Sequence, residues 1–105
     1  MSLRRDQQTD ELFRSILALS SIEECYAYFE DLCTVKEVRD MGQRLQVAAL
    51  MRGGSSYLAA QQATGASSAT IGRVKRCLDY GAGGYELILD RMKEEQRDGA
   101  GVRGM

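Results

Sequence analysis

The chain has 105 residues, of which 44% are hydrophobic and 28% charged, and its formal net charge is −1 at pH 7. This composition predicts one soluble domain with a modest core, without a signal peptide or a membrane span, and the net charge argues against a general polyanion binder. The chain has no histidine and only three cysteines. These counts argue against a zinc site and a disulfide framework, so we expect small buried apolar residues at Cys25, Cys33 and Cys77.

Residue usage favours an all-α fold. Proline is absent and β-branched residues are sparse, whereas Ala, Leu, Glu, Gln, Arg and Met are frequent. We expect a flexible N-terminus over residues 1–9, a helical domain over 10–95 and a disordered tail over 96–105. Leucine, phenylalanine and isoleucine at helical spacing predict a first helix from Asp10 to about Ala18.

Two Ser/Thr-x-x-Glu patterns predict the starts of the next helices. Ser21 with Glu24 is typical of a capping box at the second helix, and Thr34 with Glu37 indicates another at a third helix that ends at Gly53. One side of the second helix carries an apolar stripe, which favours a core or a dimer interface over a ligand cage. The stripe consists of Ile22, Cys25, Tyr26, Phe29 and Leu32.

The segment from Gly53 to Leu78 has the pattern of a helix-turn-helix. Its predicted first helix is Ser56–Thr64, and Gly65 supplies the left-handed turn. The second helix runs from Ser68 to about Leu78, with Ser67 or Ser68 as its cap. Small polar residues on the first turn of that second helix would let it enter a major groove about 12 Å wide. A glycine-rich break over residues 79–84 then precedes a last helix ending near residue 95.

Charge is unevenly distributed along the chain. Met1–Asp40 has five basic and nine acidic residues, Met41–Leu78 has five basic and none acidic, and Asp79–Met105 has four basic and six acidic. A window without carboxylates is favourable beside phosphates, so double-stranded DNA is the expected partner. Two alternatives remain open: a helical hairpin in a bundle core, which Gln61 before the turn and Gly72 within a helix would suit, and a solvated basic face.

Three stretches, EECYAYFEDLCTVKEV, QRLQVAALMRGG and TGASSATIGRVKRCLDYGAGGYEL, resemble the Trp repressor-like superfamily and, within it, the YerC/YecD group of Trp repressor-related proteins. The resemblance extends from about Leu12 to Arg91. It implies an all-helical, intertwined homodimer with two helix-turn-helix units that face successive major grooves. Their half-sites would lie about 34 Å apart on a pseudo-palindromic operator.

The resemblance also implies which residues meet DNA. Those at the start of the second motif helix would lie nearest base edges, and the cations and Gln61 nearer phosphates. Specificity would depend partly on water and DNA shape. The candidate DNA-binding residues are Gln61, Ser67, Ser68, Ala69, Thr70, Gly72, Arg73, Lys75 and Arg76.

An effector pocket follows from the same resemblance. Thr34, Arg44 and Arg73 match positions that hold the corepressor in the tryptophan-responsive member. In that pattern a glycine follows the second arginine and leaves room for the indole, whereas this chain has Val74. We therefore predict that tryptophan does not bind, expect no cofactor, and interpret Arg44 as a structural or phosphate-facing cation.

The leading interpretation is a sequence-specific, repressor-like transcriptional regulator in the bacterial cytoplasm, associated with the nucleoid when bound to DNA. The alternative is a helical protein-interaction module without specific DNA binding. We expect no enzymatic activity, metal or membrane partner, because the chain has no histidine and shows neither a metal-ligand cluster nor a phosphate-binding loop.

Overall fold

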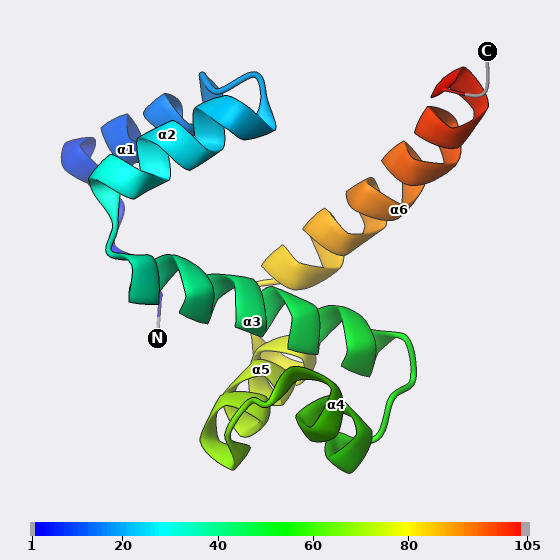
Figure 1. The fold of residues 1–105 in the computed structure, drawn as a ribbon. Helices are drawn as coiled ribbons and strands as arrows, with labels where there is room; N and C mark the ends of the chain where they lie inside the picture. The colour runs from blue at the N-terminus through cyan, green and yellow to red at the C-terminus, as the bar shows by residue number, and fades with distance from the viewer. Residues whose placement is uncertain (1, 104–105) are drawn as a thin grey trace. The chain divides into compact units, whose positions relative to one another are not determined.

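All the regular secondary structure in the described part of the chain is helical (Figure 1), which confirms the all-α prediction. The helices are α1 (Gln7–Leu17), α2 (Ile22–Leu32), α3 (Val35–Arg52), α4 (Tyr57–Thr64), α5 (Ser68–Tyr80) and α6 (Gly84–Arg103). This computed structural model describes the backbone of residues 2–103 and the side chains of residues 2–96. The fold divides into two compact units, Met1–Asp40 and Met41–Met105, and α3 contributes to both.

The starts of α1 and α2 differ from the sequence expectation. Asp6 caps α1 by accepting from the Thr9 amide at 2.8 Å, so α1 begins within the segment that was expected to be flexible. Ser21 caps α2 as predicted, but the Glu24 carboxylate accepts from Ser20, whose amide nitrogen is 2.8 Å and hydroxyl 3.0 Å away. Because Ser20 offers two hydrogen-bond donors, the Glu24 carboxylate binds to Ser20 and not to the backbone of the capping residue Ser21.

The capping box at α3 is complete. The Thr34 hydroxyl accepts from the Glu37 amide at 3.1 Å, and the Glu37 carboxylate accepts from the Thr34 amide at 2.8 Å. Both bonds satisfy amide groups that have no partner within the helix. At the other end of α3, Gly54 adopts a left-handed φ of 101°, in keeping with the predicted glycine stop.

The apolar stripe on α2 is not a core within the unit Met1–Asp40. Ile22 is 71% exposed and Tyr26 is 76% exposed, and neither α1 nor α2 has a buried residue. The two helices are linked by a 2.6 Å hydrogen bond between the Ser15 hydroxyl and the Tyr28 phenol. Burial of this stripe therefore needs a partner outside the unit.

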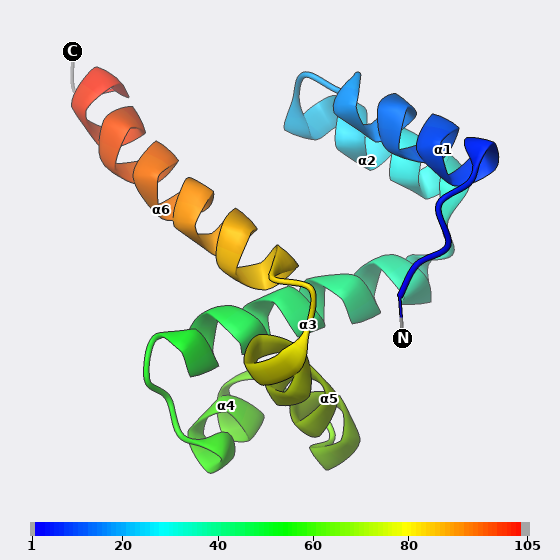
Figure 2. The same cartoon turned by 180° about the vertical axis from the view of Figure 1, so that it is seen from behind.

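The unit Met41–Met105 holds the buried core. The second half of α3, together with α4 and α5, encloses it, and both views show these helices side by side (Figures 1 and 2). Tyr85 and Leu89 of α6 pack against the core, and Arg52 at the end of α3 forms ion pairs with Glu86 and Asp90 of α6. The buried residues, each at most 2% exposed, are Val47, Ala48, Ala60, Ala66, Ile71 and Val74.

The last two helices run further than the sequence suggested. α5 continues to Tyr80, and Lys75 pairs with Asp79 across its final turn at 3.2 Å. α6 continues to Arg103, beyond the end expected near residue 95 and into the segment expected to be a disordered tail. None of the helices in residues 2–103 has the combination of length and apolar character that would cross a membrane.

Candidate nucleic-acid interface

The helix-turn-helix forms where the sequence predicted it. Ser56 caps α4 by accepting from the Ala59 amide at 3.1 Å, and Gly65 ends α4 with a left-handed φ of 73°. The Thr64 hydroxyl donates to the Ala60 carbonyl at 2.8 Å and accepts from the Ala66 amide at 3.1 Å. These local bonds close the turn with its backbone groups paired.

Small side chains bring α4 and α5 close together. Ala60 on α4 and Ala66 in the turn are buried against Ile71 and Val74 of α5. Gln43 of α3 adds a polar contact, because its amide nitrogen donates to the Thr64 carbonyl at 3.3 Å. The exposed face of α5 is thereby held on a rigid support.

Most of the predicted DNA-binding residues lie on that face. Ser68 and Ala69 are exposed on the first turn of α5, whereas Thr70, Gly72 and Gln61 are half-buried. A Cβ placed on Gly72 would meet no atom within 4 Å, so the space above this glycine is open. The first turn of α5 thus offers a surface of small side chains, as a helix that enters a groove requires.

Of the two serines that the sequence offered as caps of α5, Ser67 takes this role. It caps α5: its hydroxyl accepts from the Thr70 amide and donates to the Thr70 hydroxyl, each at 3.1 Å. Gln61 reaches Ser68, with 3.5 Å between the amide nitrogen and the serine hydroxyl oxygen. Tyr57, which the sequence did not single out, donates from its phenol to the Ser68 carbonyl at 2.8 Å. Only its place on the first turn of α4 could have marked it.

Carboxylates from later in the chain reduce the positive charge of the basic window. Arg52 is paired with Glu86 and Asp90, and Lys75 with Asp79. Within residues 2–96, Arg73 and Arg76 form no ion pair, and both are exposed. These two arginines are the cations of α5 most available to phosphates.

The residues of the expected effector pocket belong to different parts of the fold. Thr34 is occupied by the capping box of α3. Arg44 is half-buried and Arg73 is exposed, and both act electrostatically on the half-buried Tyr85. Burial raises the pKa of the Tyr85 phenol above its ordinary value of 10.0, nearby Cys77 adds to that rise, and the two arginines oppose it. Val74, which the sequence placed beside this pocket, is fully buried in the core.

The cysteines do not follow the expectation of burial. Cys77 is exposed on α5, and Cys25 and Cys33 are only half-buried. All three are free thiols. Among the described side chains, no group of three or more histidines, cysteines or acidic residues is arranged to hold a metal ion.

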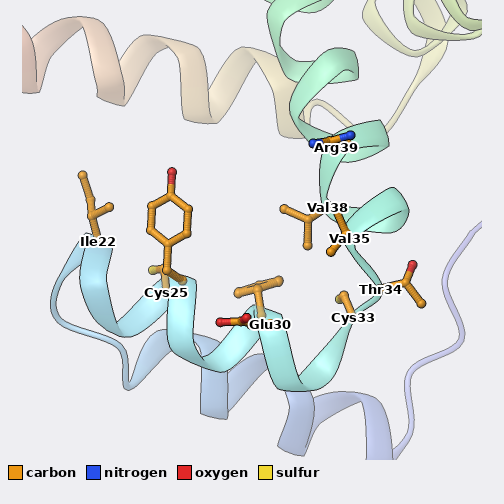
Figure 3. Close-up of a pocket in the computed structure, with 10 residues that line it drawn as sticks. Ile22, Cys25, Glu30, Cys33, Thr34, Val35, Val38 and Arg39 are labelled. Atoms are coloured by element: carbon orange, nitrogen blue, oxygen red, sulfur yellow. The ribbon is translucent and has the colours of Figure 1, made fainter.

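A second surface of interest lies within the unit Met1–Asp40. It is a largely apolar groove of about 660 Å³ between α2 and the start of α3, and Figure 3 shows Ile22 and Cys25 on α2 with Val38 opposite them on α3. Glu30 and Arg39 add one charge of each sign to its lining. Its lining residues are Ile22, Cys25, Tyr26, Phe29, Glu30, Cys33, Thr34, Val35, Val38 and Arg39.

Comparisons with known proteins agree with this fold. The family model described as Trp repressor protein matches residues 7–93. The chain is 51% identical over 94 residues to the uncharacterized protein YerC of Bacillus subtilis (strain 168), covering 90% of each sequence. A Staphylococcus aureus crystal structure described as a candidate Trp repressor has a TM-score of 0.83 and 52% identity, over 85% of this chain and 89% of the other. A TrpR-like protein from Eubacterium eligens ATCC 27750 has a TM-score of 0.82 and 42% identity, over 85% and 92%. The chain therefore belongs to the Trp repressor protein family.

Proposed function

We propose that this chain is a sequence-specific, DNA-binding transcriptional regulator that places α5 in the major groove. The observation that carries the proposal is the exposed face of α5, where Ser68 and Ala69 on the first turn are followed by Arg73 and Arg76, which form no ion pair within residues 2–96. Small side chains permit close approach to base edges, and arginines supply attraction to phosphates. Membership of the Trp repressor protein family supports the same conclusion. Such a regulator acts in the bacterial cytoplasm, at the nucleoid when bound to DNA.

The proposed roles within the interface differ from residue to residue. Ser68 and Ala69 face base edges, whereas Arg73 and Arg76 face the backbone. Lys75 contributes less to phosphate binding, because Asp79 competes for its ammonium group. With few side chains able to read bases, part of the specificity comes from water and from the shape of the DNA.

The regulator is proposed to act as a homodimer. The groove between α2 and the start of α3 exposes apolar side chains that nothing in the unit Met1–Asp40 covers, and Ile22 and Tyr26 are the most exposed of them. An exposed apolar surface of this kind is typical of a protein–protein interface. Two-fold symmetry would then present two copies of α5 to successive major grooves.

Tryptophan is not expected to be its effector. Val74 is part of the buried core, and the phenol of Tyr85 already lies in the electrostatic field of both Arg44 and Arg73. Titration calorimetry with L-tryptophan should therefore give no binding heat at micromolar to millimolar concentration. A saturable signal in the micromolar range would show that the pocket accepts the indole despite Val74.

The deciding experiment is selection of bound duplexes from a random DNA library at about 150 mM salt, where non-specific attraction is weakened. The proposal predicts enrichment of a two-fold symmetric site with half-sites about one helical turn apart. If no sequence is enriched, with or without added amino acids, specific DNA recognition fails. The alternative, a protein-interaction module, would then replace it.

A further inference from the structure

Tyr57 links the two helices of the helix-turn-helix at their exposed surface. Its phenol donates to the Ser68 carbonyl at 2.8 Å, so the first residue of α4 is joined to the first residue of α5. The distance is that of a well-formed hydrogen bond. The Ser68 carbonyl can accept it in addition to the helical bond, because a carbonyl oxygen has two lone pairs.

The Tyr57 hydrogen bond supplies a directional contact that the apolar core beneath it does not. Ala60 and Ala66 bring α4 and α5 together through small apolar contacts. Ile71 and Val74 hold α5 on this core, and Ile71 is the first buried residue of the helix, three positions after Ser68. A hydrogen bond is directional. Tyr57 therefore fixes the first turn of α5 in orientation.

The Ser68 side chain on this turn is left with a donor. Gln61 donates to the Ser68 hydroxyl oxygen over 3.5 Å, a long and weak bond that uses the oxygen as an acceptor. Among the described residues, no hydrogen bond uses the Ser68 hydroxyl as a donor. Because Ser68 is exposed, its hydroxyl hydrogen is available to an acceptor outside the chain.

We propose that Tyr57 is a positioning residue through which Ser68 reads a base as a hydrogen-bond donor. In the major groove, guanine O6 and N7, adenine N7 and thymine O4 accept a hydrogen bond, whereas the N4 amino group of cytosine is a donor. The base that faces Ser68 is therefore guanine, adenine or thymine. This inference rests on the proposed DNA-binding function and adds to it a named reader and the residue that orients the reader.

The test compares Tyr57→Phe, Ser68→Ala and the double variant with the natural chain, using the same library selection and affinities for the selected duplex. Phenylalanine keeps the ring and removes only the hydroxyl. Both single variants should lose about three- to tenfold in preference at the same base pair, the range expected from one hydrogen bond. The double variant should lose no more than the stronger single variant, because Tyr57 acts through Ser68.

Tyr80→Phe is the matched control, since Tyr80 is 87% exposed on α5 and its phenol makes no hydrogen bond among the described residues. It should select the same site as the natural chain, and thermal melting should show every variant folded. The positioning role is overturned if Tyr57→Phe keeps the natural preference or weakens binding evenly for all duplexes. It is also overturned if its effect multiplies with that of Ser68→Ala. If the natural chain itself enriches no site, the proposed function fails, and that result is distinct from these.

Discussion

Gly72 carries a cost in stability that no contact among the described residues explains. It lies within α5, where glycine is about 1 kcal/mol less favourable than alanine. A Cβ at this position would meet no atom within 4 Å, so packing within the chain does not require glycine there. Gly72 stands one helical turn after Ser68. We propose that DNA approaches α5 closely at this open space.

Gly72→Ala should accordingly stabilise the fold and weaken its proposed function. We expect an increase of about 1 kcal/mol in the free energy of unfolding, or about 4–8 °C in Tm. Affinity for the selected operator should fall about tenfold, because the added methyl group holds α5 away from the groove. Thermal melting and a DNA titration on the same preparation measure both effects.

Gly42→Ala provides the matched control, because Gly42 also lies inside a helix and its Cβ would also meet open space. It should give a similar stabilisation without loss of DNA affinity. Equal DNA affinity for Gly72→Ala and the natural chain would show that Gly72 lies away from the interface.

At the level of the helices, local chemistry made most boundaries predictable. Caps at Ser21, Thr34 and Ser67 and the left-handed turn at Gly65 depend on residues only a few positions apart, and all of them form. The hydrogen bond from the Tyr57 phenol was not predictable, because its acceptor, the Ser68 carbonyl, lies eleven residues away across the turn. α5 ends two residues beyond the expected position, and Lys75 pairs with Asp79 on its last turn. The end of α6 was missed by several residues, since the helix continues to Arg103.

The candidate interface was predicted in outline and less well in detail. The sequence indicated a surface of small residues on the first turn of α5, and Ser68 and Ala69 are exposed there. It left open whether Ser67 or Ser68 caps α5, and it did not show that Asp79 pairs with Lys75. Both depend on side-chain direction, which spacing along the chain does not determine.

The capping box of α3 makes a prediction about pH. Hydrogen bonds from the Thr34 backbone and side chain lower the pKa of the Glu37 carboxyl from its ordinary value of 4.5. A carboxyl with a lowered pKa in the folded state stabilises the fold above its ordinary pKa, and this contribution is lost as the pH falls through the lowered value. The lost stability should therefore show as a decrease in Tm below about pH 4.5.

Glu37→Gln isolates this contribution, because glutamine can accept the same bond but does not titrate. The natural chain should melt at a higher temperature than Glu37→Gln near pH 7, where the carboxylate also favours the helix N-terminus. The difference should shrink as the pH falls below 4.5. A difference that stays constant from pH 7 to pH 3 would contradict the role assigned to the Glu37 carboxylate.

In the whole molecule, the fully buried apolar side chains and the exposed apolar groove belong to different units. Every fully buried side chain among residues 2–96 lies in the unit Met41–Met105, which carries the helix-turn-helix. The unit Met1–Asp40 instead exposes its apolar side chains along the groove of α2 and α3. An apolar surface that stays exposed while another is buried is typical of a surface that binds another protein chain. The groove is therefore the surface that we expect to join two copies.

Tyr26→Glu tests this assignment. Tyr26 is 76% exposed, so a charge there leaves the single chain unstrained but would be costly inside a dimer interface. We expect light scattering at micromolar concentration to give twice the 11.6 kDa chain mass for the natural protein and a lower mass for the variant. Binding to the two-fold operator should weaken with it, since one α5 reads only one half-site.

Tyr80→Glu introduces the same change on α5 and should leave the mass doubled. If the natural protein has the mass of a single chain, or if Tyr26→Glu stays dimeric, the groove is not the dimer interface.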